Sequence, residues 1–282
     1  MVKILSDSTC DLSQELLEKY DISILPLHIL LGEKEYCDGV DITPDEIFQW
    51  SDAQKTTPKT SAPALDMAME MLEPFVKEKQ PVICFSISED MSTSANVMRM
   101  AASELEAEDL VTVIDSASLS TGIGLLVLHA AEMAQAGKNV EEIQTEIEEL
   151  KSKVRASFVV DTLVYLYRGG RCSGLAAMFG SALHLHPMIV VEEGKMHSSK
   201  KYRGKLSKVI LDYAKDLKEQ MEQARSERVF ITHSGCSPEV VEKVRSFLEE
   251  LHIFDEILIT RAGGVISSHC GPGTLGVLFI EK

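Results

Sequence analysis

The chain has 282 residues, 45% of them hydrophobic, a length that favours two domains over one and permits a large buried interior. Its 44 acidic and 28 basic residues give a formal net charge of -16, so the field of the whole protein disfavours binding to nucleic acid or to an anionic lipid surface. No apolar run is long enough for a transmembrane segment, and the N-terminus turns polar too early for a secretion signal, so we expect a soluble protein.

Short apolar runs alternate with amphipathic segments in the first half of the chain. Periodicity predicts strands at residues 2–5, 22–31, 82–86 and 110–114, and helices that begin near residues 12 and 44 and span 64–79, 94–106, 123–136 and 139–154. Asp11 with Gln14 has the spacing of a helix cap, as Thr43 has with Glu46, whereas the prolines of residues 54–63 predict a loop. This alternation predicts an α/β domain with a mainly parallel, Rossmann-like sheet and helices on both faces.

The second half is predicted to form another α/β domain. Strands are expected at residues 158–160, 188–191, 229–232, 256–260 and 277–280, and helices at 205–223 and 238–251. The turn at Glu192, Glu193 and Gly194 separates an apolar from a polar run, which indicates a hairpin and therefore a mixed sheet. We place the domain boundary near Arg155, which gives domains of residues 1–155 and 156–282.

Four clusters of small polar residues follow or border apolar sequence, at residues 6–9, 60–61, 92–94 and 267–269. Each is compatible with a helix cap, because Ser, Thr and Asp side chains accept hydrogen bonds from the free N–H groups at a helix start. In a doubly wound sheet, however, ligand-binding loops lie at the carboxyl ends of the strands. Four such clusters are more easily explained if some of them also bind an anionic group.

His269 stands just before the turn Gly271-Pro272-Gly273, which presents it on a stiff, closely approachable backbone. A half-buried structural imidazole fits this segment as well as a functional one does. As a functional group, His269 would donate a hydrogen bond to a carboxylate or act as a base for a nearby serine. The second role defines a competing hypothesis, a lipid hydrolase with Ser92 as nucleophile, although the chain has no G-x-S-x-G elbow.

Cations gather in two places. Arg168-Gly169-Gly170-Arg171 opens a Gly-rich loop ahead of an Ala- and Leu-rich helical segment at residues 175–185, but it lacks the spacing of a nucleotide-binding P-loop. Residues 195–211 carry six cations and no acid. Such a run is usually a solvated face, and it also suits a phosphate, an acidic partner or a ligand head group.

Neither metal nor disulfide chemistry is indicated. His184 and His186 would share one face of a strand, but no carboxylate or cysteine stands at convincing ligand spacing. The six cysteines are dispersed without a C-x-x-C pair, which argues against a zinc knuckle and a disulfide framework and favours the reducing cytoplasm. We therefore predict no metal and no cofactor.

Five motifs, taken in chain order, resemble those of the DegV family. They are Ser6-Asp7-Ser8-Thr9-Cys10-Asp11-Leu12, Thr60-Ser61-Ala62-Pro63, Ile114-Asp115-Ser116 with Ser120-Thr121-Gly122, Tyr165-Leu166-Tyr167-Arg168-Gly169-Gly170-Arg171, and His269-Cys270-Gly271-Pro272-Gly273. Each motif is weak singly, but the five in register span nearly the whole chain. The resemblance implies a two-domain α/β protein that holds a long-chain fatty acid, such as palmitate, between its domains and is not itself an enzyme.

The resemblance also implies a partner. The chain would be the acyl-binding subunit of a bacterial fatty-acid kinase, and a separate ATP-dependent kinase subunit would convert the bound acid to an acyl phosphate for phospholipid synthesis. Arg171 and Arg203 match family arginines that are expected at the pocket mouth and on the kinase-facing surface.

Thr60, Ser92 and His269 match the family residues that hold the carboxylate. This chain departs from the family pattern beside two of them, with Ser92-Thr93-Ser94 in place of S-G-T and Thr60-Ser61-Ala62-Pro63 in place of T-S-Q-P. Ser61 and Ser94 are therefore additional candidates for the carboxylate contact.

Simple energetics fits such a ligand. Burial of each methylene contributes about 0.8 kcal/mol, so a 16-carbon tail contributes roughly 12 kcal/mol before binding entropy is subtracted. An unpaired carboxylate in the same interior would cost several kcal/mol, so hydroxyl and imidazole donors are needed where it stops. We expect a polar cluster at one end of an apolar tunnel; residues 175–185 and the 12 methionines suit its wall, and ordinary core equally well.

Overall fold

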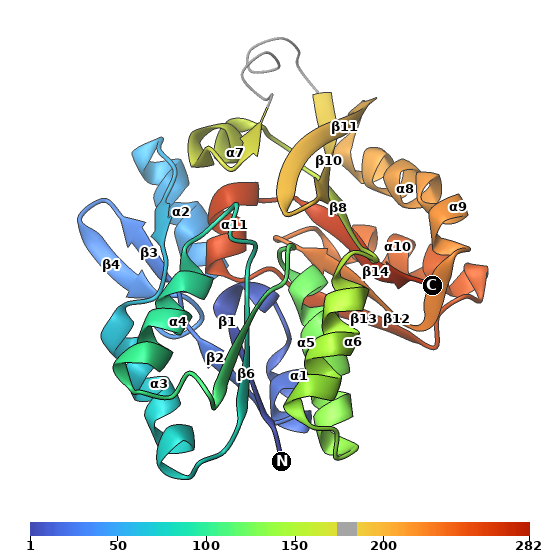
Figure 1. Cartoon of the computed structure of the whole chain (residues 1–282). Helices are drawn as coiled ribbons and strands as arrows, with labels where there is room; N and C mark the ends of the chain where they lie inside the picture. Colours follow the sequence, from blue (N-terminus) through green and yellow to red (C-terminus); the bar gives the residue numbers. More distant parts are fainter. Residues whose placement is uncertain (174–184) are drawn as a thin grey trace.

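A computed structural model describes residues 1–173 and 185–282 (Figure 1). The N-terminal part contains a four-stranded sheet of order β2-β1-β6-β7 in which every pairing is parallel. Its strands are β1 (Lys3–Asp7), β2 (Ile22–Leu25), β6 (Val82–Ser86) and β7 (Val111–Asp115). The helices around it are α1 (Gln14–Lys19), α3 (Leu65–Lys77), α4 (Ser94–Glu104), α5 (Thr121–Gln135) and α6 (Val140–Lys151), with a 3-10 turn, η1 (Ser8–Cys10), after β1.

Helices cover both faces of this parallel sheet. Successive side chains of a strand point to opposite faces of the sheet. Ile4 and Ile83 pack with α5 on one face, whereas Leu5 and Cys84 pack with α3 and α4 on the other. The predicted Rossmann-like arrangement is therefore confirmed.

The C-terminal part contains a seven-stranded mixed sheet of order β13-β12-β14-β8-β10-β11-β9. Its strands are β8 (Val154–Val159), β9 (Cys172–Ser173), β10 (Leu185–Glu192), β11 (Lys195–Arg203), β12 (Ala224–His233), β13 (Glu256–Arg261) and β14 (Leu275–Glu281). The β10–β11 hairpin turns at Glu193 and Gly194, as predicted, and both of these residues have positive φ angles. Arg155, where we predict the domain boundary, is the second residue of β8.

Helix α5 lies between the two large sheets. Leu125, Leu126, Val127 and Leu128 are all buried, although they face successive directions around the helix. One side of α5 contacts β1 and β6, and the other contacts β8 and β14. Helices α8 (Leu206–Asp216), α9 (Lys218–Met221) and α10 (Pro238–Leu251) pack on the far face of the mixed sheet, where the sequence predicts one helix at 205–223 rather than α8 and α9.

A small antiparallel sheet of order β4-β3-β5 stands beside the parallel one. It comprises β3 (His28–Leu31), β4 (Lys34–Cys37) and β5 (Lys59–Ser61), and it packs with α2 (Pro44–Gln54) and α11 (Gly264–Cys270). The capping box predicted for Thr43 and Glu46 is present at the start of α2. Helix α7 (Val164–Gly169) contacts α11 from the other side.

Three local predictions need correction. Asp11 does not cap α1: it has a φ angle of 51° and directs its carboxylate elsewhere, while Ser13 accepts the capping hydrogen bond. Residues 54–63 are not entirely a loop, because Lys59–Ser61 pair with β3 as β5, a partner that no local pattern reveals. Residues 22–31 form two strands rather than one, since Pro26 stands between β2 and β3.

Two predictions concern residues that the structure does not describe. The helical segment expected at 175–185 and the position of His184 lie outside the described residues, apart from Leu185 at the start of β10. Within residues 1–173 and 185–282, no helix combines the length and the apolar character that a membrane crossing requires.

Candidate functional site: a cavity with a Thr60–His269 pair

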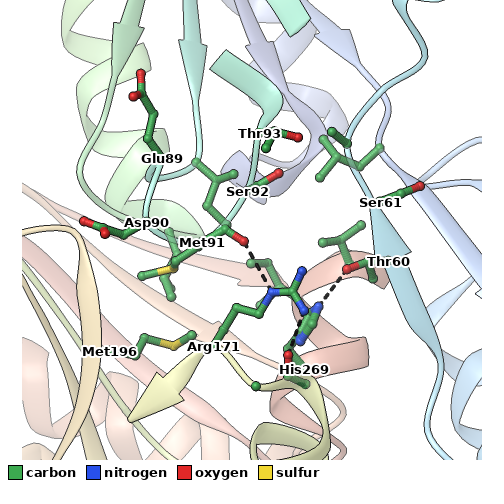
Figure 2. Close-up of a pocket in the computed structure, with 18 of the residues that line it drawn as sticks. Thr60, Ser61, Glu89, Asp90, Met91, Ser92, Thr93, Arg171, Met196 and His269 are labelled. Carbon is green, nitrogen blue, oxygen red and sulfur yellow. Dashed lines mark hydrogen bonds between the residues drawn. The ribbon is translucent and has the colours of Figure 1, made fainter. Parts of the chain in front are cut away.

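A cavity of about 530 Å³ opens where the two large sheets and the small sheet meet. Its volume lies within the range typical of small-molecule sites, roughly 300–1,000 Å³. The lining comes from segments distant in sequence: Leu27, Thr60, Ser61, Ala62, Ile87, Glu89, Asp90, Met91, Ser92, Thr93, Leu119, Gly169, Gly170, Arg171, Met196, Val265, Ile266, His269 and Cys270. Thr60, Ser61, Ser92, Arg171 and His269, all singled out by the sequence, thus share one cavity (Figure 2).

Thr60 and His269 form a polar pair at one edge of this cavity. Thr60 lies on β5 and His269 on the last turn of α11, and Thr60 Oγ1 is 2.7 Å from His269 Nε2. The sequence places His269 before the Gly-Pro-Gly turn; the structure shows that it belongs to α11, which ends at Cys270 immediately before that turn. The imidazole Nδ1 is shielded from solvent and has no hydrogen-bond partner among the described residues.

His269 is neutral near pH 7. Burial, and to a smaller extent the positive charge of Arg171, lower its pKa from 6.5 to about 4. In a neutral imidazole one ring nitrogen donates and the other accepts. If Nε2–H donates to Thr60 Oγ1, the Thr60 hydroxyl proton remains available for an acceptor in the cavity.

Ser92 lies in the loop that follows β6, and a buried carboxylate holds the start of that loop. Asp7 Oδ2 accepts the N–H of Ile87 at 2.9 Å, and burial raises the pKa of Asp7 to about 6. Ser92 Oγ is 3.0 Å from Ser94 Oγ. Ser94 is fully buried and does not line the cavity, so the structure places it behind Ser92.

Ser61 lines the same cavity but has a different orientation from Thr60. Consecutive residues of a strand point to opposite faces. Figure 2 shows the Ser61 hydroxyl directed away from His269, whereas the Thr60 hydroxyl faces it. Of the two, Thr60 is therefore the one that the imidazole orients.

Arg171 lies beside His269 in the same cavity (Figure 2). It follows Gly170, whose φ of 69° ends α7 in the left-handed region that glycine tolerates. Its Nη1 donates to the carbonyl oxygen of Gly169 at 2.8 Å, and its Nε donates to the carbonyl oxygen of Met91 at 3.4 Å (Figure 2). Arg171 thus connects the α7–β9 turn to the loop that carries Ser92.

Arg203 lies elsewhere. It is the exposed last residue of β11, outside the cavity lining. Within the same basic segment, Lys200 forms an ion pair with Asp216 at 2.6 Å. The structure therefore separates Arg171, at the cavity, from Arg203, on the surface.

The apolar wall was not identified from the sequence. Leu27, Ile87, Leu119, Val265 and Ile266 line the cavity, and nothing in the sequence distinguishes them from ordinary core residues. A narrow apolar cavity of about 20 Å³ shares Leu119, Ile266 and Cys270 with the larger one. Its walls include Phe158 of β8 and Leu278 of β14, so the apolar space extends towards the mixed sheet.

The described residues contain no group of His, Cys, Asp and Glu side chains arranged to hold a metal ion. Both ring nitrogens of His186 lie near backbone carbonyl oxygens. Nδ1 is 3.2 Å from the oxygen of Val160, and Nε2 is 3.1 Å from that of Gly204. Both nitrogens of His186 therefore already have protein partners, which is typical of a structural side chain.

The chain resembles known proteins over its full length. The model of the DegV family of uncharacterised proteins matches residues 1–282. A DegV domain-containing protein of Clostridium perfringens is 31% identical over 283 residues, covering 100% of this chain and 99% of the relative.

Solved structures give the same result. A DegV family protein from Thermus thermophilus, described as binding fatty acid, has a TM-score of 0.90 at 30% identity, covering 100% of this chain and 99% of the other. A stearic-acid-binding protein from Eubacterium ventriosum has a TM-score of 0.87 at 32% identity, with the same two coverages. The two-domain α/β architecture of these proteins is the one described above.

Proposed function

Because the chain belongs to the DegV family, we propose that it binds a long-chain fatty acid in the described cavity, with the carboxylate at Thr60, Ser92 and His269. The observation that carries this proposal is the contact of 2.7 Å between Thr60 Oγ1 and His269 Nε2 at the edge of an apolar cavity. Similar proteins from Thermus thermophilus and Eubacterium ventriosum are described as binding fatty acids.

Hydrogen-bond chemistry supports this head-group site. A carboxylate accepts hydrogen bonds and donates none, so it needs free donors. With His269 Nε2–H donating to Thr60 Oγ1, the Thr60 hydroxyl donates to one carboxylate oxygen. Ser92, across the cavity, supplies a second hydroxyl. Arg171 adds a positive charge at the same edge, which favours the ionised acid.

The hydrolase hypothesis has less support. A serine nucleophile requires a base within hydrogen-bond reach. Here the Ser92 hydroxyl is 3.0 Å from that of Ser94, and His269 Nε2 is directed at Thr60. The arrangement suits carboxylate binding better than proton abstraction from Ser92.

The same proposal includes a partner. The bound acid would be presented to a separate ATP-dependent kinase subunit in the cytoplasm, and the resulting acyl phosphate would enter phospholipid synthesis. The chain itself would then be a binding subunit rather than a catalyst. Arg171, at the cavity edge, would lie beside the reacting carboxylate, and the exposed Arg203 would contact the kinase.

Ligand binding is tested by denaturing the purified protein, extracting it and analysing the extract by mass spectrometry. We expect a long-chain fatty acid, and we expect delipidated protein to bind palmitate on titration. Absence of both would refute the proposal. Release of free acid from an ester substrate, abolished by Ser92→Ala, would favour the hydrolase instead.

The partner surface is tested separately. Arg203→Ala should abolish kinase-dependent formation of acyl phosphate while palmitate binding stays intact. Lys138→Ala, which removes an exposed cation just before the start of α6, is the control and should leave turnover unchanged. Unchanged turnover in Arg203→Ala would exclude this role.

A further inference from the structure

Two buried carboxylates hold the start of α11, the helix that carries His269. Asp11 Oδ1 accepts the N–H of Gly263 at 2.8 Å, and Asp38 Oδ1 accepts the N–H of Gly264 at 2.7 Å. These are among the first N–H groups of the helix, which have no partner within the helix itself. We infer that Asp11 and Asp38 are positioning residues, which set the place of His269 and thereby the affinity for the ligand head group.

A second hydrogen bond, from a serine outside α11, holds each carboxylate in place. Asp11 Oδ2 accepts the hydroxyl of Ser120 at 2.5 Å, and Asp38 Oδ2 accepts that of Ser8 at 2.8 Å. The exposed fraction is 5% for Asp11 and 3% for Asp38. A buried carboxylate with both oxygens bonded has little freedom to turn, so each one defines the position of the N–H group that it accepts.

One small sheet contacts both ends of α11. Asp38 directly follows β4, while Thr60 lies on β5, and β3 joins these strands into a single sheet. Asp38 is hydrogen-bonded to Gly264, the first residue of the helix, and Thr60 is hydrogen-bonded to His269, the sixth. A shift of the start of α11 would therefore move His269 relative to Thr60, since the helix spans fewer than two full turns between those residues.

The helix can approach Asp38 so closely because its first residue is glycine. A Cβ on Gly264 would lie 2.6 Å from Ile29 Cδ1 and 2.8 Å from Asp38 Oδ1. Real Cβ atoms do not tolerate such contacts, so a side chain at this position would force apart Asp38, Ile29 and the start of the helix. Gly264→Ala is thus a second, independent way to disturb the same contact.

The inference rests on the proposed fatty-acid binding and makes a distinct prediction. Loss of the positioning residues affects the polar head group, whereas the tail contacts remain. Affinity for a fatty acid should therefore fall while affinity for the alcohol with the same chain should not. A purely structural role for Asp38 would lower both affinities by the same factor.

The experiment is a competition between palmitic acid and hexadecan-1-ol for delipidated full-length protein, with the retained ligands measured by mass spectrometry. Asp38→Ala and Gly264→Ala should each lower the ratio of acid to alcohol by about tenfold, the size of one lost hydrogen bond. Asp38→Asn and Asp11→Asn keep an acceptor for the N–H group and should lose less. Tyr213→Phe removes buried hydrogen bonds to Ser157 in the C-terminal core, and as the control it should leave the ratio unchanged.

Each outcome separates the two proposals. If the wild-type protein retains neither ligand, the proposed function fails before the inference is tested, and the inference falls with it. If the wild-type protein retains the acid but Asp38→Ala and Gly264→Ala keep the wild-type ratio, the positioning role is refuted. A ratio lowered equally by Tyr213→Phe would also refute it, because general destabilisation would then explain the effect.

Discussion

Thr60 Oγ1 and His269 Nε2 lie 2.7 Å apart although 209 positions separate them in the chain. Thr60 comes from the edge strand β5 of the small sheet, and His269 from the short helix α11 near the C-terminus. The contact exists only because α11 packs between the small sheet and α7. The candidate head-group site is thus a product of that packing, and the predictions below follow from it.

Removal of the Thr60 hydroxyl should weaken acid binding. Thr60→Val conserves the shape of the side chain but removes its donor, so the affinity for palmitate should fall roughly 10- to 100-fold, the size of a hydrogen bond to a charged group. Titration calorimetry on delipidated protein measures it. Thr145→Val, on the exposed face of α6, removes a comparable hydroxyl and should have no effect. Equal affinities for Thr60→Val and the wild type would exclude Thr60 as a ligand contact.

His269 should make the fold less stable in acid. Its pKa falls from 6.5 in the unfolded chain to about 4 in the fold, so between these values the unfolded state binds a proton that the folded state does not. The stability from neutral His269 is complete above pH 6.5, and about 3 kcal/mol of it should be lost as the pH falls from 7 to 4.

The matched variant for this test is His269→Gln, which has no titrating group. Denaturant unfolding of both proteins at pH 7 and pH 4 gives the difference, in which the titration of the buried Asp7 and Asp11 cancels. A difference that is independent of pH would show that His269 titrates normally.

Arg171 should act on His269 through charge. Burial is the larger cause of the low pKa of His269, and the positive charge of Arg171 adds to it. Arg171→Ala should therefore raise the pKa of His269, as measured by NMR titration of the imidazole signals. His129, whose pKa is lowered by burial and by Arg225, serves as an internal control and should not change. An unchanged pKa for His269 would mean that the two side chains are not coupled.

Gly169 should tolerate no side chain while His269 is present. A Cβ at this position would lie 2.3 Å from His269 Nδ1. We expect Gly169→Ala to destabilise the protein by about 1–3 kcal/mol, the usual cost of overpacking, and to weaken acid binding.

A double-mutant cycle isolates the contact between Gly169 and His269. Once His269→Ala has removed the imidazole, the addition of Gly169→Ala should cost much less than it does alone. If the destabilisations caused by the two single substitutions simply add in the double variant, Gly169→Ala acts through the backbone and not through contact with His269.

The sequence by itself determined the secondary structure wherever a local cause acts. The capping box of Thr43 and Glu46 starts α2, and the run Val82–Ser86 forms β6 as predicted. The alternation of strands and helices was sufficient for the parallel sheet, and the turn at Gly194 for the mixed one. The resemblance to the DegV family, carried by five short motifs, is confirmed by a match over residues 1–282.

Local patterns failed where a distant segment supplies the partner. Asp11 has the spacing of a helix cap, yet its carboxylate bonds Gly263, 252 positions away. Lys59–Ser61 form a strand only because β3 offers an edge. In both cases the energy comes from a hydrogen bond to a group that the neighbouring sequence does not contain.

Thr60 and His269 could be named from the sequence because their motifs are local, but their pairing could not. Only the tertiary structure decided that His269 lies on a helix held at its start by Asp11 and Asp38, that Thr60 contacts it, and that Arg171 lies beside it in the same cavity. The physical reason is that sequence periodicity reports which face of an element is buried, whereas the positions of these side chains depend on how separate elements pack together.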